Sequence, residues 1–89
     1  MMSWTEWREA MSDFTVIGPG GSISAGRVIA IGRWDSAPMR REVRRARAEG
    51  KLIDLTYGHA CRWVFFMDSG HVVLGTQLGQ DGTIYAVVQ

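Results

Sequence analysis

The sequence predicts an α+β fold: a small, mostly antiparallel sheet of about five strands packed by one central arginine-rich helix, with a short N-terminal helix outside. Three observations support this prediction. Residues 36–50 have helix signals at both ends. Several short apolar runs, separated by glycine-containing turns, have the length and composition of strands. A chain of 89 residues has room for one small domain.

The N-terminal segment, residues 3–11, has the pattern of a short amphipathic helix. Ser3 and Glu6 stand at capping-box spacing, while Trp4, Trp7 and Met11 share one stripe. Because exposed tryptophans are costly, this stripe is expected to dock, either on its own domain or on a neighbouring subunit.

Extended segments are expected at residues 14–17, 22–24, 27–31, 52–56, 62–67, 71–74 and 83–88. The glycine-rich residues 18–21 are interpreted as a turn, because no Lys-Ser/Thr ending and no helix pattern follow them, as a phosphate-binding loop requires. Residues 62–74 form a hairpin through a turn at residues 68–70. The first strand of this hairpin is apolar on both faces, so we expect the sheet to be covered twice, once by the central helix and once by another subunit or the N-terminal helix.

The central helix has clear boundaries. Ser36 is a suitable N-cap, Pro38 suits the first turn and Gly50 ends the helix. Apolar residues recur at helical spacing and form the inward face; they are Met39, Val43 and Ala46.

A stripe of arginines, Arg40, Arg44 and Arg47, lies beside that inward face. Glu42 and Glu49 can pair with Arg45, but no acidic residue stands three or four places from the stripe, and each like-charge pair costs about 0.2–0.5 kcal/mol. A stripe that weakens its own helix is typical of a surface that binds a phosphate backbone or an acidic neighbouring chain. A solvated arginine face is the alternative.

Composition limits the class of protein. The net charge is only +1, yet residues 40–51 carry six basic and two acidic residues, so any anion-binding surface is local. The single cysteine forbids an internal disulfide and fits a reducing compartment. No run approaches the roughly 18 apolar residues of a membrane span, and the N-terminal residues lack the basic-then-apolar pattern of a secretion signal. We therefore expect a soluble cytoplasmic protein.

The sequence offers little for catalysis. The candidate metal ligands are Asp54, His59, Cys61, Asp68 and His71. Their spacing matches no zinc pattern, and neither a nucleophile elbow nor a buried orienting acid accompanies Ser69 and His71. We therefore expect no enzyme activity, no metal and no cofactor.

Several segments in one order resemble the bacterial extracellular-matrix regulator family typified by RemA. They are residues 24–31, 35–38, 46–47, 50–58 and 68–74, within a match that spans roughly residues 14–77. Members of that family are small DNA-binding transcriptional regulators of biofilm matrix genes that assemble into rings. The resemblance therefore implies residues 14–77 as a family-like core, with residues 1–13 as a helical extension and residues 78–89 as an added turn and strand of the single domain.

The resemblance also implies specific contacts with DNA. Arg27 stands where the family has an arginine implicated in DNA contact, and Gly26 stands where the family commonly has Asn, which predicts a left-handed turn before Arg27. After Tyr-Gly the family typically has Arg-Arg-x-Arg, and here residues 59–62 read His-Ala-Cys-Arg. Arg62 alone remains an arginine, and His59 adds charge only when protonated.

The leading hypothesis is an oligomeric, ring-forming regulator that holds double-stranded DNA by its phosphate backbone. Arg27 and Arg62 are the principal contacts, His59 is an auxiliary contact, and the stripe of Arg40, Arg44 and Arg47 is a secondary surface. The alternative hypothesis is an oligomeric assembly module without DNA binding, in which the stripe pairs with acidic residues of a neighbouring chain.

Overall fold

The computed structural model describes residues 1, 3–6 and 14–79. Its elements are β1 (Phe14–Gly18), β2 (Gly21–Ser24), the 3₁₀ turn η1 (Ala25–Arg27), β3 (Val28–Arg33), α2 (Ala37–Ala48), β4 (Leu52–Asp54), β5 (Trp63–Met67) and β6 (Val72–Gly75). The α+β prediction is confirmed, although the described part of the chain has six strands in two sheets. At the N-terminus the Glu6 N–H donates to Ser3 Oγ at 3.2 Å, while the remainder of the expected N-terminal helix and the expected strand at 83–88 fall outside the described residues.

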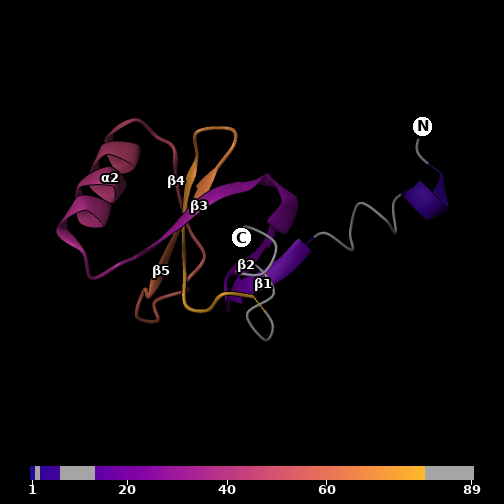
Figure 1. The fold of residues 1–89 in the computed structure, drawn as a ribbon. Coiled ribbons are helices and arrows are strands. Elements are labelled where there is room, and N and C mark those ends of the chain that lie inside the picture. The colour runs from indigo at the N-terminus through magenta and orange to yellow at the C-terminus, as the bar shows by residue number, and fades with distance from the viewer. Residues whose placement is uncertain (2, 7–13, 80–89) are drawn as a thin grey trace.

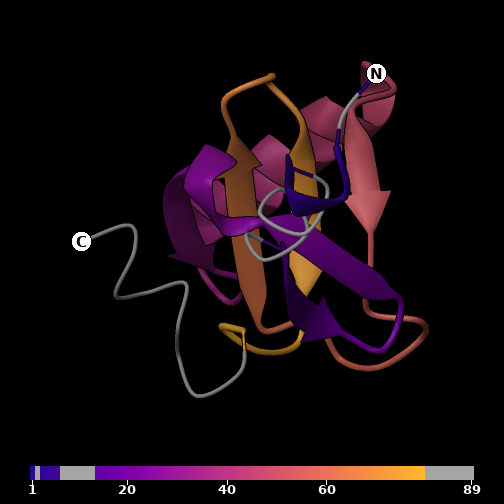
Figure 2. The same cartoon turned by 90° about the vertical axis from the view of Figure 1, so that its right-hand side faces the viewer.

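The four-stranded sheet has the order β3-β5-β6-β4, and β1 and β2 form a separate antiparallel hairpin. β5 is antiparallel to both β3 and β6, whereas β4 is parallel to β6. Figure 1 shows the main sheet between α2 on one side and the β1–β2 hairpin on the other. Figure 2 shows the hairpin crossing in front of the sheet, with α2 behind.

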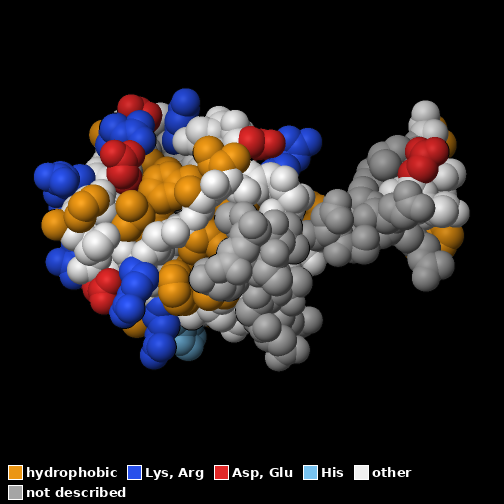
Figure 3. Space-filling view, viewed as in Figure 1, with side chains coloured by type: hydrophobic (Ala, Val, Ile, Leu, Met, Phe, Trp, Pro, Cys, Tyr) orange, Lys and Arg blue, Asp and Glu red, His pale blue; other side chains and the backbone are white. Residues whose placement is uncertain are grey.

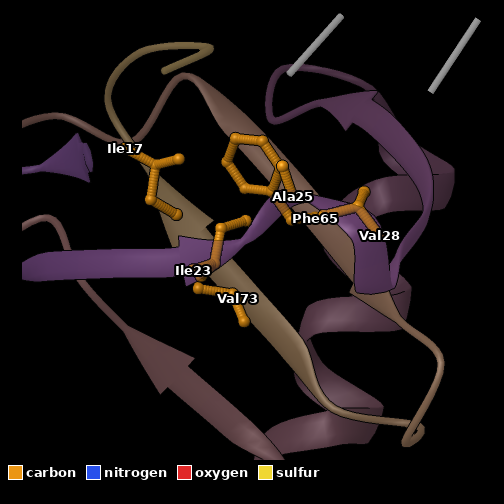
Figure 4. Packing of buried hydrophobic residues seen from close by; sticks show 6 residues of the cluster. All are labelled: Ile17, Ile23, Ala25, Val28, Phe65 and Val73. Atoms are coloured by element: carbon orange, nitrogen blue, oxygen red, sulfur yellow. The ribbon is translucent and has the colours of Figure 1, made fainter. Parts of the chain in front are cut away.

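The β1–β2 hairpin covers the second face of the main sheet, and the expectation that another subunit or the N-terminal helix does so is wrong. Successive β5 residues face opposite ways: Phe65 packs under the hairpin and Val64 under α2. The cluster beneath the hairpin consists of Ile17, Ile23, Ala25, Val28, Phe65 and Val73 (Figure 4). Both apolar faces of β5 are therefore buried within one chain.

The central helix forms as its sequence predicts. Ser36 is the N-cap, with its Oγ accepting the Met39 N–H at 3.3 Å, and Pro38 lies in the first turn. At the other end the Lys51 N–H donates to the Ala46 carbonyl at 2.8 Å and the Gly50 N–H to the Arg47 carbonyl at 3.2 Å. These two bonds, with Gly50 at φ +73, make a Schellman cap.

The inward face of α2 is also as expected. Val43 and Ala46 are buried and Met39 is half-buried, all packed against β5 and β6. No helix in the described part of the chain is long and apolar enough to cross a membrane.

The glycine-rich turn lets the hairpin lie against the chain after β4. The Gly20 N–H donates to the Leu55 carbonyl oxygen at 2.9 Å. A Cβ added at Gly18 or Gly20 would stand 2.4 or 2.8 Å from that same oxygen. The glycines therefore provide close backbone approach rather than a phosphate site.

Candidate nucleic-acid interface

The sheet has two ends, and its register places the two arginines expected to contact DNA at opposite ends. Because β3, β4 and β6 are mutually parallel and antiparallel to β5, all three begin at the end of the sheet where β5 finishes. We call this the Arg27 end, and the opposite one, where β5 begins, the Arg62 end. Arg62 precedes β5 and Asp68 follows it, so six residue steps of about 3.3 Å separate the two ends by roughly 20 Å.

At the Arg27 end, the 3₁₀ turn η1 carries the chain from β2 into β3 and presents Arg27. The Arg27 side chain is 69% exposed, and its Nη1 lies 3.4 Å from Asp68 Oδ2. The Asp68 N–H also donates to the Arg27 carbonyl at 2.9 Å, so the backbone fixes this position against the β5–β6 turn.

Gly26 does not have the left-handed conformation expected before Arg27. It lies within η1 and is not among the glycines with positive φ. The Val28 N–H donates to the Ala25 carbonyl, so the crossing from hairpin to main sheet is a tight right-handed turn. Arg27 is presented outward all the same.

At the Arg62 end, His59 and Arg62 lie together as the sequence suggests. Both line a shallow hollow of about 350 Å³, with Pro19, Ala60 and Thr76. The His59 N–H donates to the Thr56 carbonyl and the Arg62 N–H to the Gly75 carbonyl, each at 3.0 Å. Within the described residues, Arg62 forms no ion pair.

Two residues at this end are not singled out by the sequence patterns. Arg33 closes β3 opposite Trp63, and it lines a second hollow that Arg62 also lines. The recurrence of the dipeptide Arg-Trp, at residues 33–34 and 62–63, is the signal that could have identified it.

The second overlooked residue is Tyr57. Its φ is +51, a conformation that is uncommon for a residue other than glycine, and the residue is 80% exposed. Asp54 Oδ1 holds the preceding turn by accepting the Thr56 N–H at 2.9 Å and the Thr56 hydroxyl at 2.5 Å. The loop thereby displays an aromatic ring two residues before His59.

The arginines on the surface of α2 differ in their partners, as expected: Arg45 pairs with glutamates, and the stripe does not. Arg45 Nε donates to Glu42 at 3.0 Å and Arg45 Nη1 lies 3.4 Å from Glu49, and the hydrogen bond to Glu42 is the main cause that raises the pKa of Arg45. The stripe of Arg40, Arg44 and Arg47 is exposed and forms no ion pair with any described residue. Arg40 instead lies over the Trp34 ring, 5.9 Å from its centroid.

Figure 3 shows how basic side chains are distributed on one face of the molecule. They gather over α2 and again below it, near the lower end of β5, where a histidine lies beside them. Apolar side chains occupy the middle of this face, between the basic groups. The candidate interface is therefore a set of separate basic groups and not one continuous patch.

Two further titratable groups, Cys61 and His71, have local hydrogen-bond partners. Burial is the main cause that raises the pKa of the Cys61 thiol, which donates to the Trp63 carbonyl at 3.5 Å. His71 Nδ1 lies 2.8 Å from Ser69 Oγ within the turn. Among the residues that the structure describes, no group of three or more potential metal ligands comes together.

The chain is similar to one protein family and to several regulatory proteins of bacteria. The family model described as RemA-like, extracellular matrix regulatory protein A-like, matches residues 14–78. A regulatory protein of Geobacillus kaustophilus is 47% identical over 66 residues, which cover 74% of this chain and 76% of the relative. A regulatory protein of a Synechococcus strain is 52% identical over 58 residues, 65% of each chain, and one of Bacillus cytotoxicus is 51% identical over 61 residues, 68% of this chain and 70% of the relative.

Proposed function

The chain belongs to the RemA-like family of extracellular matrix regulatory proteins, and from this membership we propose that it is an oligomeric, ring-forming, DNA-binding transcriptional regulator of the cytoplasm. The observation that carries the proposal is Arg62, exposed beside His59 and without an ion pair in the described part of the chain. An exposed guanidinium of this kind binds phosphate oxygens readily. The relatives are themselves named as regulatory proteins.

Arg27 supplies the second principal contact in this proposal. Its ion pair with Asp68 is solvent-exposed, and exposed pairs contribute about 0–1 kcal/mol, so a phosphate can take the place of the carboxylate. A duplex lying along the strand direction meets both ends of one sheet, and about 20 Å corresponds to roughly six base pairs at 3.4 Å each. Contacts at both ends go to phosphates rather than to base edges, so selectivity would come from DNA shape.

The open edges of the main sheet support oligomerisation. β3 and β4 are its edge strands, and each exposes an isoleucine: Ile29 is 66% exposed and Ile53 is 42% exposed. The edges differ, so β3 of one copy meeting β4 of the next is a head-to-tail contact, which closes into a ring when the rotation allows. The register shift around Ile29 interrupts the β3 ladder, so the proposed contact packs side chains and does not extend the ladder.

A second candidate function is an assembly module without DNA binding. The observation that favours it is that residues 59–62 read His-Ala-Cys-Arg and carry one permanent positive charge, where the family resemblance implies three arginines. In this case the stripe of Arg40, Arg44 and Arg47 pairs with acidic residues of a neighbouring chain.

A salt titration with labelled duplex DNA separates the two functions. We expect log affinity to fall linearly with log salt for the wild-type oligomer, and Arg62→Ala to reduce the slope by about 0.9 for each phosphate contact removed. Arg27→Ala should do the same. Arg41→Ala is the matched control, because Arg41 is exposed on α2, outside the stripe, and forms no ion pair among the described residues.

The mass of the protein in solution is measured in the same buffers. An intact oligomer that fails to bind DNA even at about 50 mM salt would exclude the regulator and favour the assembly module. Equal losses for Arg62→Ala and Arg41→Ala would show that binding depends on net charge and not on the Arg62 end.

A further inference from the structure

The hollow between the end of β3 and the start of β5 combines aromatic and cationic walls. Its volume is about 390 Å³, and it is lined by Arg33, Trp34, Asp35, Cys61, Arg62 and Trp63. This volume is at the lower end of the range for small-molecule sites, about 300–1,000 Å³. Two tryptophans and two arginines therefore line an open hollow of ligand size.

The backbone holds these walls in place from both strands. The Trp34 N–H donates to the Arg62 carbonyl at 3.0 Å, and Arg33 pairs with Trp63 in the β3–β5 register. The Arg62 N–H is bonded in turn to the Gly75 carbonyl at 3.0 Å. A site held in this way loses little conformational entropy when a ligand enters.

The side chains define the chemistry that fits. Trp34 and Trp63 are half-buried: Trp34 packs with the cluster under α2 and Trp63 with the cluster under the β1–β2 hairpin, and both line the hollow at this end of the sheet. The exposed part of an indole is a surface on which a planar ring can stack. Guanidiniums bind phosphate in a bidentate manner.

The charges around the hollow are unequal. Arg33 forms an ion pair with Asp35, with 3.2 Å between Arg33 Nη2 and Asp35 Oδ2, but Arg62 forms no ion pair within the described residues. Arg40, over the Trp34 ring at 5.9 Å, adds positive charge nearby. A ligand of this hollow is therefore planar, aromatic and anionic.

We propose that this hollow is a binding site for a free mononucleotide, with the base against the tryptophans and the phosphate at Arg33 and Arg62. Arg62 also belongs to the DNA surface proposed above, so a bound nucleotide competes with the duplex for it. The competition rests on the proposed function, whereas the binding itself does not.

Calorimetric titration of the full chain with GMP tests the binding. We expect saturable binding with a Kd between about 10 μM and 1 mM, weakened at least about tenfold by Arg33→Gln and by Arg62→Gln. The matched control Arg41→Gln should stay within about twofold of wild type. Guanosine lacks the phosphate and ribose 5-phosphate lacks the base, so each should bind at least about tenfold more weakly than GMP.

Three results would overturn the nucleotide site. Inorganic phosphate binding as tightly as GMP would reduce the hollow to a general anion site. An absence of saturable heat up to about 5 mM GMP would exclude a site of useful affinity. Equal weakening by Arg41→Gln and Arg33→Gln would show that binding follows net charge.

A displacement experiment then tests the competition. GMP added to wild-type protein on labelled duplex should release the DNA, while ribose 5-phosphate at the same ionic strength should not. Simultaneous binding of both without release would overturn the competition. If GMP binds and the duplex never does, the nucleotide site stands and the DNA proposal fails; if the duplex binds and GMP does not, the reverse holds.

Discussion

At the scale of single residues, Cys61 shows how packing at the Arg62 end controls a reactive group. The side chain is half-buried and packs against the cluster of buried residues under α2. Burial is the main cause that raises the pKa of its thiol, and the Asp54 charge adds to the rise. The neutral thiol is therefore favoured in the folded protein.

This shift predicts a loss of stability at alkaline pH. The folded pKa lies above the unfolded one, so the neutral thiol contributes fully below the unfolded value of about 8.5, and the contribution is lost as pH rises through the folded value. The urea midpoint of the wild type should therefore fall relative to that of Cys61→Ser as the pH rises from about 7 to about 10. A difference that stays constant over this range would contradict the predicted titration. Tyrosine and lysine ionisation affects both proteins alike, so the comparison isolates the thiol.

At the scale of elements, the C-terminal cap of α2 depends on one backbone conformation. Gly50 has φ +73 and an added Cβ would meet no atom within 4 Å, so Gly50→Ala should destabilise only through the left-handed backbone, by about 1–2 kcal/mol. Gly26→Ala is the matched control, because its Cβ also meets open space and its φ is not positive. We expect that control to be neutral or up to about 1 kcal/mol more stable.

Urea unfolding of the two variants distinguishes the cap from a general effect of alanine. The midpoint should fall for Gly50→Ala with an unchanged slope, since the surface exposed on unfolding is the same. Equal destabilisation of both variants would exclude the cap as the cause.

Elements specified by local signals could be predicted from the sequence. Ser36, Pro38 and Gly50 mark α2, and the turn around Gly70 marks the β5–β6 hairpin. The position of the β1–β2 hairpin over the second face of the sheet could not be predicted from the sequence. It depends on contacts between residues distant in sequence, such as the Thr76 N–H donating to the Ile17 carbonyl at 2.7 Å.

The candidate site divides in the same way. Arg27 and Arg62 follow from matched motifs and His59 from its place in the same loop, and the structure presents all three at the surface. Gly26 was expected to be left-handed, but the crossing between two sheets sets its conformation, which no local pattern encodes. Arg33 joins the Arg62 end only through the β3–β5 register, since about thirty residues of chain separate it from Arg62.

At the scale of the whole molecule, the sheet divides its basic groups between two ends and its exposed isoleucines between two edges. Copies joined edge to edge by rotation about an axis along the strands keep their strands parallel. All Arg27 ends would then lie on one side of the ring and all Arg62 ends on the other. A duplex along the strand direction would meet both ends of one subunit, and a duplex that follows the ring would meet the contacts of successive subunits.

This arrangement predicts that a charge on one edge breaks the assembly. Ile29→Lys places an ammonium group in the proposed apolar contact, so we expect light scattering after gel filtration to show a smaller species. Val16→Lys is the matched control, because Val16 is also exposed but lies on β1, away from the main sheet edges. If Val16→Lys dissociates the oligomer and Ile29→Lys does not, the interface lies at the β1–β2 hairpin and not at the β3 edge.

The same variant tests whether the assembly supplies the affinity for DNA. Each added lysine brings positive charge, which by electrostatics alone strengthens binding to phosphates. Loss of the ring removes repeated contacts on one duplex, and avidity from such contacts is worth about 10²–10⁴-fold. We therefore expect the dissociated Ile29→Lys protein to bind duplex DNA at least about tenfold more weakly than wild type at equal salt, despite its higher charge. A dissociated variant that binds as tightly as wild type would show that Arg27 and Arg62 of a single subunit are sufficient.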